Sequence, residues 1–413
     1  MDHRNARSLG MIPERLDRIV PHMQRLVDAG HFPGIMTMIY RRGELAHLGI
    51  CGQADMRRKT PLQRDTIFRI YSMSKPITAV ATLMLLEEGR LLLSDPVANY
   101  IPEFADARVF VGGIADAPLV EAARRPITIR DLLTHTAGLA YGLTDNSPVD
   151  ALYRRVMGRA QGREDVSLNQ FLTDRIVITL EELVADLAKQ PLANQPGAMW
   201  RYSIAMAVLG RVVEVVSGLP YEQFLRERLF GPLGMVDTGF HVPPDKLERF
   251  AALYAPDPRG GLAEADDPLA SRIWSQPSIC PMGGEMMVST IDDYGRFARM
   301  LLNGGELDGA RILGRKTVEL MASNHLSPDL LPFGWPGNLQ VGRGFGLGVS
   351  MVTDVGATGL PGSVGAYGWG GAASTIYWVD PQEALVALLM TQVVANPIPS
   401  GDQFRALVYQ ALA

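Results

Sequence analysis

Lysine is scarce in this chain of 413 residues. Of its 39 basic residues only five are lysines, and arginine supplies the rest: Lys59, Lys75, Lys189, Lys246 and Lys316. Arginine satisfies a position that needs only a positive charge, whereas lysine can also lose its proton when it is buried. Lys75, which stands three residues after Ser72, is therefore a candidate base.

Cysteine and long apolar runs are also lacking. The two cysteines, Cys51 and Cys280, are too few for a disulfide framework and lack metal-ligand spacing, so we expect buried thiols and no metal site. No apolar run approaches the ~20 residues that cross a bilayer. The N-terminal M-D-H-R-N-A-R-S has no apolar segment of the kind found in signal peptides. We therefore expect a cytoplasmic protein without membrane contact.

The charge pattern and several missing motifs narrow the function further. A net charge of -5 and the absence of a basic run give no reason to expect a nucleic-acid partner. Ser363 lies in P-G-S-V-G, where Pro361 replaces the first glycine of a nucleophile elbow. No lysine follows a glycine, there is no H-E-x-x-H, and G-R-G-F-G-L-G misses the dinucleotide spacing. We expect no cofactor, and nothing in the pattern indicates an oligomeric state.

The N-terminal segment predicts a helix followed by a hairpin. Apolar residues recur at helical spacing over residues 12–30, despite Pro21. Residues 35–40 and 45–52 are β-prone and are separated by the turn sequence R-R-G-E. These two runs predict a β-hairpin.

Helical patterns dominate the middle of the chain, and strands return near its end. A helix is predicted over residues 75–89, ended by Gly89, and helical patterns continue to about residue 240. After residue 343 three strand-like runs follow, G-F-G-L-G-V-S-M-V, S-T-I-Y-W-V-D and A-L-V-A-L-L-M-T. A helix over residues 401–412 ends the chain.

This order of elements predicts an α/β fold of the α+β type, in which an antiparallel sheet is flanked by N- and C-terminal helices. Residues 1–74 and 285–413 would form the sheet domain, and residues 75–284 a mainly helical domain inserted between its halves. Long polar or Pro- and Gly-rich stretches over 140–180 and 324–342 predict loops that border a site, the first of them lid-like. We expect the active site to lie between the two domains.

Ser72 and Lys75 form an S-x-x-K motif. Ser72 follows the strand-like run I-F-R-I-Y and precedes a helix with Pro76 in its first turn. Positions i and i+3 share a helix face, so the amine of Lys75 can reach the hydroxyl of Ser72. The alternative is that Ser72 only caps the helix and Lys75 lies on the surface. The motif alone leaves both interpretations open.

Two further segments favour the catalytic interpretation. They are W-R-Y-S-I-A, which contains Tyr202, and Y-G-W-G-G-A-A-S near the C-terminus. With them the sequence resembles the serine β-lactamases and penicillin-binding proteins, and in particular the family VIII carboxylesterases. L-L-T-H-T-A-G-L, L-F-G-P-L-G-M and M-V-S-T-I-D-D-Y are also similar to family segments. The resemblance runs from about residue 12 to the C-terminus.

The resemblance implies a role for each matching residue. Ser72 would be the acylated nucleophile and Lys75 the base that accepts its proton, while Tyr202 would serve leaving-group departure and water activation. The third family motif falls on the substrate-binding residues Trp369, Gly370 and Gly371. The backbone N–H of Ala372 would complete the oxyanion hole with that of Ser72. Burial beside a tyrosine would tune Lys75 toward its neutral form, and the residue that takes the first proton is left open.

Other residues near these motifs have more than one interpretation. Tyr141 could line the acyl pocket or serve packing alone. His135 fits a structural role in its turn better than a catalytic one. The three aromatic residues Trp274, Phe333 and Trp335 could form the rim of the site or anchor loops in the core.

Two departures from the β-lactamase pattern point to esters. Ile204 stands where those enzymes have an asparagine that binds the β-lactam side chain. Trp369 replaces a lysine that holds the β-lactam carboxylate, and it offers an indole N–H but no charge. We therefore expect a serine carboxylesterase that hydrolyses small, neutral, short-acyl esters through an acyl-enzyme.

Three alternatives remain for the function. An acyltransferase would use the same Ser-Lys-Tyr site but pass the acyl group to an alcohol or amine. A β-lactamase or D-amino-peptidase-type hydrolase is disfavoured by Trp369 and Ile204, although weak β-lactam turnover is compatible with the shared nucleophile. A binding module without catalysis has no need of a lysine that can deprotonate, so it is the least favoured.

Overall fold

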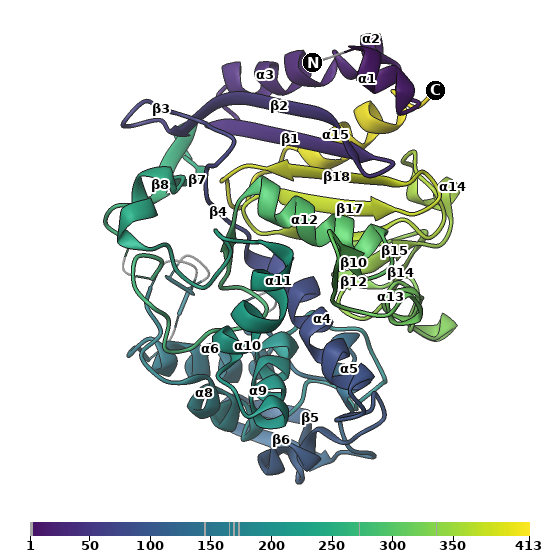
Figure 1. Cartoon of the computed structure of the whole chain (residues 1–413). Helices are drawn as coiled ribbons and strands as arrows, with labels where there is room; N and C mark the ends of the chain where they lie inside the picture. The colour runs from purple at the N-terminus through teal and green to yellow at the C-terminus, as the bar shows by residue number, and fades with distance from the viewer. Residues whose placement is uncertain are drawn as a thin grey trace.

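The computed structural model describes residues 3–143, 146–164, 166–167, 170–171, 174–271, 273–335 and 337–413. Figure 1 shows a sheet with helices on both faces above a mainly helical region. The sheet takes strands from both ends of the chain, as the sequence predicts. The expected α+β architecture is confirmed.

In the described part of the chain, eight strands form one sheet in the order β14-β15-β16-β17-β18-β1-β2-β3, with antiparallel neighbours. Their bounds are β1 Gly34–Arg41, β2 Glu44–Asp55, β3 Thr60–Pro61, β14 Arg343–Phe345, β15 Ser350–Val352, β16 Tyr367–Gly371, β17 Thr375–Asp380 and β18 Leu385–Met390. The central strands β1 and β18 are buried along their whole length and place Met36 opposite Met390. This pairing joins the two ends of the chain.

The predicted N-terminal hairpin is confirmed as β1 and β2. Its two turn residues, Arg42 and Gly43, have φ angles of 50° and 84°. Positive φ at both central residues is typical of a type I′ turn, whose twist matches that of the strands it connects.

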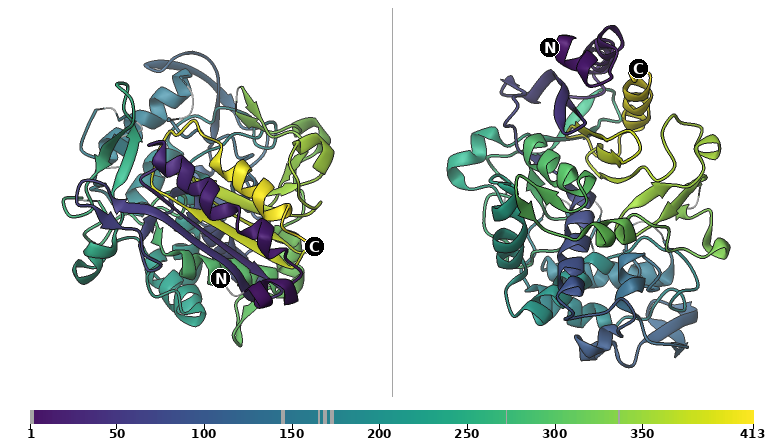
Figure 2. Two further views of the ribbon diagram at one scale, coloured as in Figure 1. Left: turned by 90° about the horizontal axis from the view of Figure 1, so that it is seen from above. Right: turned by 45° about the vertical axis from the view of Figure 1, so that its right-hand side comes forward.

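Helices cover both faces of the sheet. One face carries α1 His3–Ser8, α2 Pro13–Leu16, α3 Ile19–Asp28 and α15 Ser400–Tyr409, and the other carries α12 Ile291–Leu302. Figure 2 shows α3 and α15 side by side, with both chain ends near them. The single helix predicted over residues 12–30 is two helices, α2 and α3. Pro21 is the third residue of α3, where the missing N–H removes no intrahelical bond.

The helical region is built around α4, which is buried on all sides from Ser74 to Leu85 and packs against α9. Its helices are α4 Ser74–Glu87, α5 Ile129–Leu133, α6 Pro148–Ala160, α8 Leu180–Ala188, α9 Ala205–Ser217, α10 Tyr221–Leu225 and α11 Gly231–Leu233. Gly89, with φ 68°, follows the end of α4 as predicted. Two short helices, α13 Arg315–Met321 and α14 Val355–Thr358, lie beside the sheet edge.

Short strands pair in twos outside the main sheet: β4 Phe68–Arg69 with β9 Val288–Ser289, β5 Arg108–Ile114 with β6 Ala117–Ala122, β7 Leu253–Pro256 with β8 Leu262–Asp266, β10 Glu306–Leu307 with β11 Ala310–Arg311, and β12 Gly334–Trp335 with β13 Asn338–Leu339. The β5–β6 hairpin lies within the region where helices were predicted to dominate, and the sequence did not indicate it. Most of its residues are exposed, so no buried face imposes a period-two pattern on the sequence.

The predicted loop over residues 140–180 is corrected in part. Helix α6 occupies its centre, with Ser147 as its N-cap and Pro148 in the first turn. Seven residues of the predicted lid-like segment lie outside the described residues: Thr144, Asp145, Asp165, Leu168, Asn169, Leu172 and Thr173. The lid and the domain boundaries at 74/75 and 284/285 stay predictions, and both boundaries fall within the site described below.

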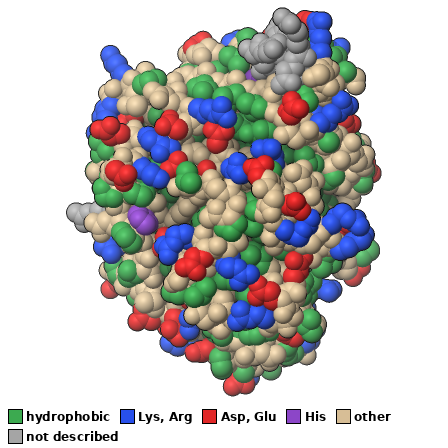
Figure 3. Space-filling view, viewed as in Figure 1, with side chains coloured by type: hydrophobic (Ala, Val, Ile, Leu, Met, Phe, Trp, Pro, Cys, Tyr) green, Lys and Arg blue, Asp and Glu red, His purple; other side chains and the backbone are tan. Residues whose placement is uncertain are grey.

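The surface carries charges of both signs. On the face shown in Figure 3, basic and acidic side chains are interspersed. None of the helices that the structure describes has the length and apolar character that crossing a membrane requires.

Candidate active site

Ser72 lies in a tight turn at the start of α4. The 3₁₀ turn Tyr71–Met73 connects β4 to the helix and leaves Ser72 partly exposed. Tyr71 has φ 42°, a left-handed conformation that is rare for a bulky residue. Its buried ring packs edge-on against Trp274, with 6.0 Å between the ring centroids. Such strained residues persist where packing holds them, and they concentrate at functional sites.

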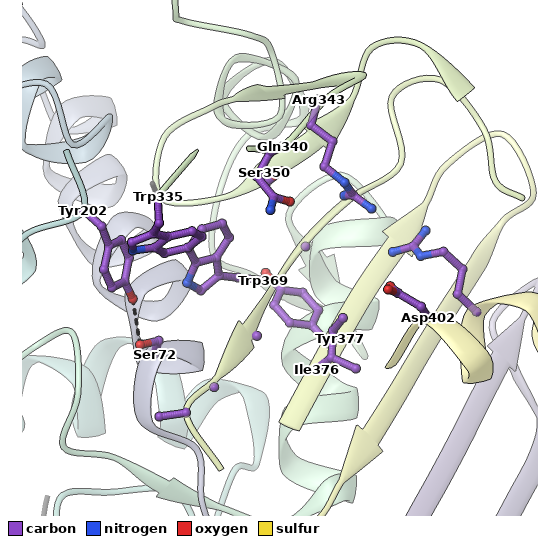
Figure 4. A pocket seen from close by; sticks show the side chains of 15 residues that line it. Ser72, Tyr202, Trp335, Gln340, Arg343, Ser350, Trp369, Ile376, Tyr377 and Asp402 are labelled. Carbon is purple, nitrogen blue, oxygen red and sulfur yellow. Dashed lines mark hydrogen bonds between the residues drawn. The ribbon is translucent and has the colours of Figure 1, made fainter. Parts of the chain in front are cut away.

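The structure brings together the three predicted catalytic side chains. The Tyr202 hydroxyl donates to Ser72 Oγ at 2.7 Å, the contact drawn in Figure 4, and Lys75 Nζ donates to the same oxygen at 3.3 Å. Tyr202 precedes α9, which packs against α4. The spacing predicted from the sequence is confirmed for Ser72 and Lys75. The packing of α9 against α4 brings Tyr202 to the same oxygen.

Lys75 has a carboxylate partner that the sequence did not indicate. Its Nζ lies 3.1 Å from Glu285 Oε1 and 2.8 Å from the carbonyl oxygen of Gly284, and the Lys75 and Glu285 side chains are 1% and 3% exposed. Burial alone lowers the pKa of Lys75, but the charge of Glu285 and then that of Tyr202 outweigh it, so this pKa is raised. The expectation that burial tunes Lys75 toward neutrality is therefore wrong. The charge of Glu285 thus favours the protonated form of Lys75.

Two glycines allow the loop with Glu285 to approach the helices. A Cβ at Gly283 would lie 2.8 Å from the carbonyl oxygen of Met206, and one at Gly284 would lie 3.0 Å from Lys75 Nζ. In the sequence P-M-G-G-E-M-M, the glycine pair before an acidic residue is the feature that could have indicated this loop. No spacing to Lys75 could reveal it, because the contact spans 210 residues.

A cavity of about 430 Å³ opens beside Ser72. Ser72 and Tyr202 line one end, β16 forms a wall, and Trp335 and Gln340 come from the predicted loop 324–342. Figure 4 shows Tyr202, Trp335 and Trp369 gathered near Ser72, with Arg343 and Asp402 at a distance from it. The expectation that residues 324–342 border the site is confirmed.

The third predicted motif forms part of the cavity wall. Trp369, Gly370, Gly371 and Ala372 all line it. A Cβ at Gly371 would lie 2.4 Å from the carbonyl oxygen of Ile70, so only glycine lets this strand approach the turn that carries Ser72. The close approach places Ala372 on the same wall as Ser72.

Aromatic rings enclose the reacting end of the cavity. The centroids of Trp335 and Trp369 lie 5.4 and 5.9 Å from that of Tyr202. Trp335 lies at the cavity and Phe333 packs behind it against Trp200, at 4.8 Å. Trp274, 1% exposed, belongs to the core. Of the three aromatic residues whose role the sequence left open, Trp335 lines the site, whereas Phe333 and Trp274 serve packing.

Tyr141 and His135 support Tyr202 from behind. Tyr141 does not line this cavity, and its ring centroid lies 5.6 Å from that of Tyr202. His135 is fully buried, lies 4.8 Å from the Tyr202 ring, and has its Nδ1 3.2 Å from Ser203 Oγ. Burial and then the charge of Lys75 lower the pKa of His135 well below its ordinary value, so it is neutral. Contact of Tyr141 with substrate stays a prediction.

No group of three histidine, cysteine or acidic side chains that could hold a metal ion is found within the described ranges. The fold and the Ser72 site define a serine hydrolase with the β-lactamase fold. The Beta-lactamase family model matches residues 19–410. The chain therefore belongs to the Beta-lactamase family, which confirms the resemblance seen in the sequence.

Individual relatives cover nearly the whole chain. Protein Rv1367c of Mycobacterium tuberculosis is 38% identical over 91% of this chain and 90% of its own length. Esterase EstB of Burkholderia gladioli is 31% identical over 87% of this chain and 85% of its own. Among solved structures, EstCE1, "a hydrolase with promiscuous acyltransferase activity", is similar with a TM-score of 0.79 and 29% identity, covering 96% of this chain and 99% of that one.

Proposed function

We propose that this protein is a carboxylesterase that hydrolyses small esters through an acyl-enzyme on Ser72. The observation that carries the proposal is the double contact of Ser72 Oγ with Tyr202 and Lys75 beside an aromatic cavity. Serine is a weak nucleophile at its own pKa, and an adjacent base activates it. The likeness to esterase EstB supports ester hydrolysis.

In acylation, the Tyr202 hydroxyl first loses its proton to water, and the phenolate then acts as the base. Its oxygen takes the proton of Ser72, and Ser72 Oγ attacks the ester carbonyl to form a tetrahedral oxyanion. The Lys75 cation stabilises the phenolate, because its ammonium group lies 4.7 Å from the centroid of the Tyr202 ring. The phenol then donates its proton to the departing alkoxide, which leaves as the alcohol.

The oxyanion is held by the backbone N–H groups of Ser72 and Ala372. Both residues line the cavity, and removal of one such donor typically costs ~3–4 kcal/mol of transition-state stabilisation. Deacylation repeats the sequence with water in place of Ser72. Tyr202 takes a proton from water, hydroxide attacks the acyl carbonyl, and the proton returns to Ser72 Oγ as the acid leaves.

The acyl group beside Ser72 is small and neutral in this proposal. Trp335 and Trp369 present apolar faces there, and neither carries a charge. Ile204 is buried and does not line the cavity, so the preference against β-lactams rests on Trp369 alone.

Turnover of a short-chain nitrophenyl ester, measured beside ring opening of a chromogenic cephalosporin, tests this function. Wild-type protein should release nitrophenol quickly and open the cephalosporin slowly, and Ser72→Ala should lose the ester activity. Ester turnover that is absent, or that survives in Ser72→Ala, would overturn the acyl-enzyme mechanism. Fast cephalosporin opening would instead identify a β-lactamase.

Acyl transfer is the second candidate, favoured by the likeness to EstCE1. An alcohol would then replace water in the second half-reaction, with the same proton steps at Tyr202. Product analysis in the presence of a short alcohol separates the two. A dominant new ester would identify a transferase, and a dominant free acid a hydrolase.

A further inference from the structure

The end of the cavity away from Ser72 is basic. Arg343 at the start of β14 and Arg405 in α15 line the same cavity as the nucleophile. Figure 4 shows the Arg343 side chain extending toward the region where Asp402 lies. Arg405 is only 5% exposed, and its guanidinium group lies 4.4 Å from the centroid of the Trp378 ring.

The chain leaves these two guanidinium groups incompletely satisfied. Neither guanidinium forms a salt bridge within the described residues, and Arg405 Nη1 is buried there without a hydrogen-bond partner. Burial and then the charge of Arg405 lower the pKa of Arg343 to about 10, so it stays charged at neutral pH. Asp402 lines the same cavity but is exposed, so water screens its charge, and the buried Asp380, whose charge also acts on Arg405, accepts a hydrogen bond from Tyr409.

Other buried cations of this protein have a carboxylate. Lys75 pairs with Glu285, Arg69 with Asp266 and Arg41 with Glu383. A buried charge without a partner is costly, and the unpaired groups of a binding site are commonly those that a ligand satisfies. Ser350 adds a second such group, because its buried Oγ lines the cavity and lacks a partner among the described residues.

We propose that Arg343 and Arg405 bind a carboxylate of the substrate, so that the enzyme acts on esters with an anionic group remote from the reacting carbonyl. The planar guanidinium fork matches a carboxylate through two parallel hydrogen bonds. The inference rests on the proposed ester function and refines its substrate. The acyl carbonyl meets the neutral aromatic end, and the negative charge lies at the arginine end.

Two matched pairs of esters test the inference. One is mono-4-nitrophenyl adipate with its methyl ester, which places the carboxylate on the acyl side. The other is 4-acetoxybenzoate with its methyl ester, which places it on the alcohol side. In at least one pair, kcat/KM should favour the anion by about tenfold or more, mainly through KM. Wild-type protein without such a preference in either pair would overturn the proposal.

Variants of the two arginines test whether they cause the preference for the anionic ester. Arg343→Gln and Arg405→Gln should each bring the anion-to-neutral ratio toward one, and Arg405→Lys should keep part of it because the charge remains. Arg259→Gln is the control, since Arg259 is 90% exposed and pairs with Asp257. A ratio that changes equally in Arg259→Gln, or that persists in both pocket variants, would contradict the assignment.

Binding without turnover separates this inference from the ester function. Calorimetry on Ser72→Ala should detect adipate, and Arg405→Gln in that background should weaken it about tenfold or more. If adipate binds but wild-type protein turns over no ester, the proposed esterase function is wrong and the proposed anion site is still supported. Tighter binding of butyl phosphate than of adipate would contradict the proposal of a carboxylate ligand and would indicate a phosphate instead.

Discussion

Lys75, behind the nucleophile Ser72, and Arg405, at the far end of the cavity, are two buried cations with different surroundings. Lys75 is 1% exposed and held by Glu285, whereas Arg405 is 5% exposed and forms no salt bridge among the described residues, although the charges of Asp402 and Asp380 act on it. An internal partner fixes a side chain in one geometry, as catalysis requires. A missing partner leaves a charge for a ligand to satisfy. A cation with an internal salt bridge thus serves catalysis beside Ser72, and a cation without one serves substrate recognition at the arginine end of the cavity.

Lys75→Met should have the largest effect. It removes the cation that supports Tyr202, and we expect kcat/KM for a neutral nitrophenyl ester to fall by at least about 10³-fold. It also leaves Glu285 buried without its partner, so the free energy of unfolding should fall by about 3 kcal/mol. Steady-state kinetics and urea unfolding measure the two effects.

Lys189→Met is the matched control, because Lys189 is 67% exposed and pairs only with Asp186. Surface ion pairs contribute less than about 1 kcal/mol. Equal losses in the two variants would mean that burial and pairing of Lys75 are not what matters.

Glu285→Gln should have the next largest effect and should decide the role of Lys75. Without the carboxylate, burial dominates and the pKa of Lys75 falls. If Lys75 acts as a cation, the alkaline limb of kcat/KM moves to lower pH, and activity at pH 9 falls by about 10-fold or more. The profile from pH 6 to 10.5 measures the shift. Higher activity of Glu285→Gln near pH 7 would instead make neutral Lys75 the base.

The same substitution has a stability consequence of defined sign. The pKa of Lys75 is raised in the folded state, so its ion pair contributes stability that is fully present below the unfolded value of about 10.4. That contribution is lost as pH rises through the higher folded value. In Glu285→Gln the folded pKa of Lys75 is lower, so the gap in unfolding free energy between wild type and this variant should be constant below that lowered value and shrink as pH rises from it through the raised wild-type value. A gap that widens there would contradict the ion pair.

The sequence predicted the catalytic end far better than the recognition end. Ser72 and Lys75 are three residues apart, one in the turn that enters α4 and the other in the first turn of that helix, so spacing alone indicates their contact. Glu285 reaches Lys75 across 210 residues from a loop, and packing rather than local pattern sets that distance.

The arginines escaped prediction for a similar reason. Arg343 and Arg405 come from β14 and α15, at different places in the sheet domain, and each alone resembles an ordinary surface residue in the sequence. The sheet was predictable because β1 and β18 are continuous buried runs, while the exposed β5–β6 hairpin left no periodic signal. Local pattern thus found elements and motifs, but not the long-range pairing of charges.

Arg405→Met should have the smallest effect, and it completes the comparison with Lys75→Met. Methionine removes a buried charge that forms no salt bridge among the described residues, which favours folding, but it also loses the contact of the guanidinium with Trp378, worth about 0.5–2 kcal/mol. These changes oppose each other, so we expect the free energy of unfolding to stay within about 1 kcal/mol of wild type. Adipate should raise the Tm of wild type and not that of the variant, since only a bound anion makes Arg405 stabilising. If Arg405→Met unfolded as readily as Lys75→Met, Arg405 would be a structural residue and the contrast between the two ends would fail.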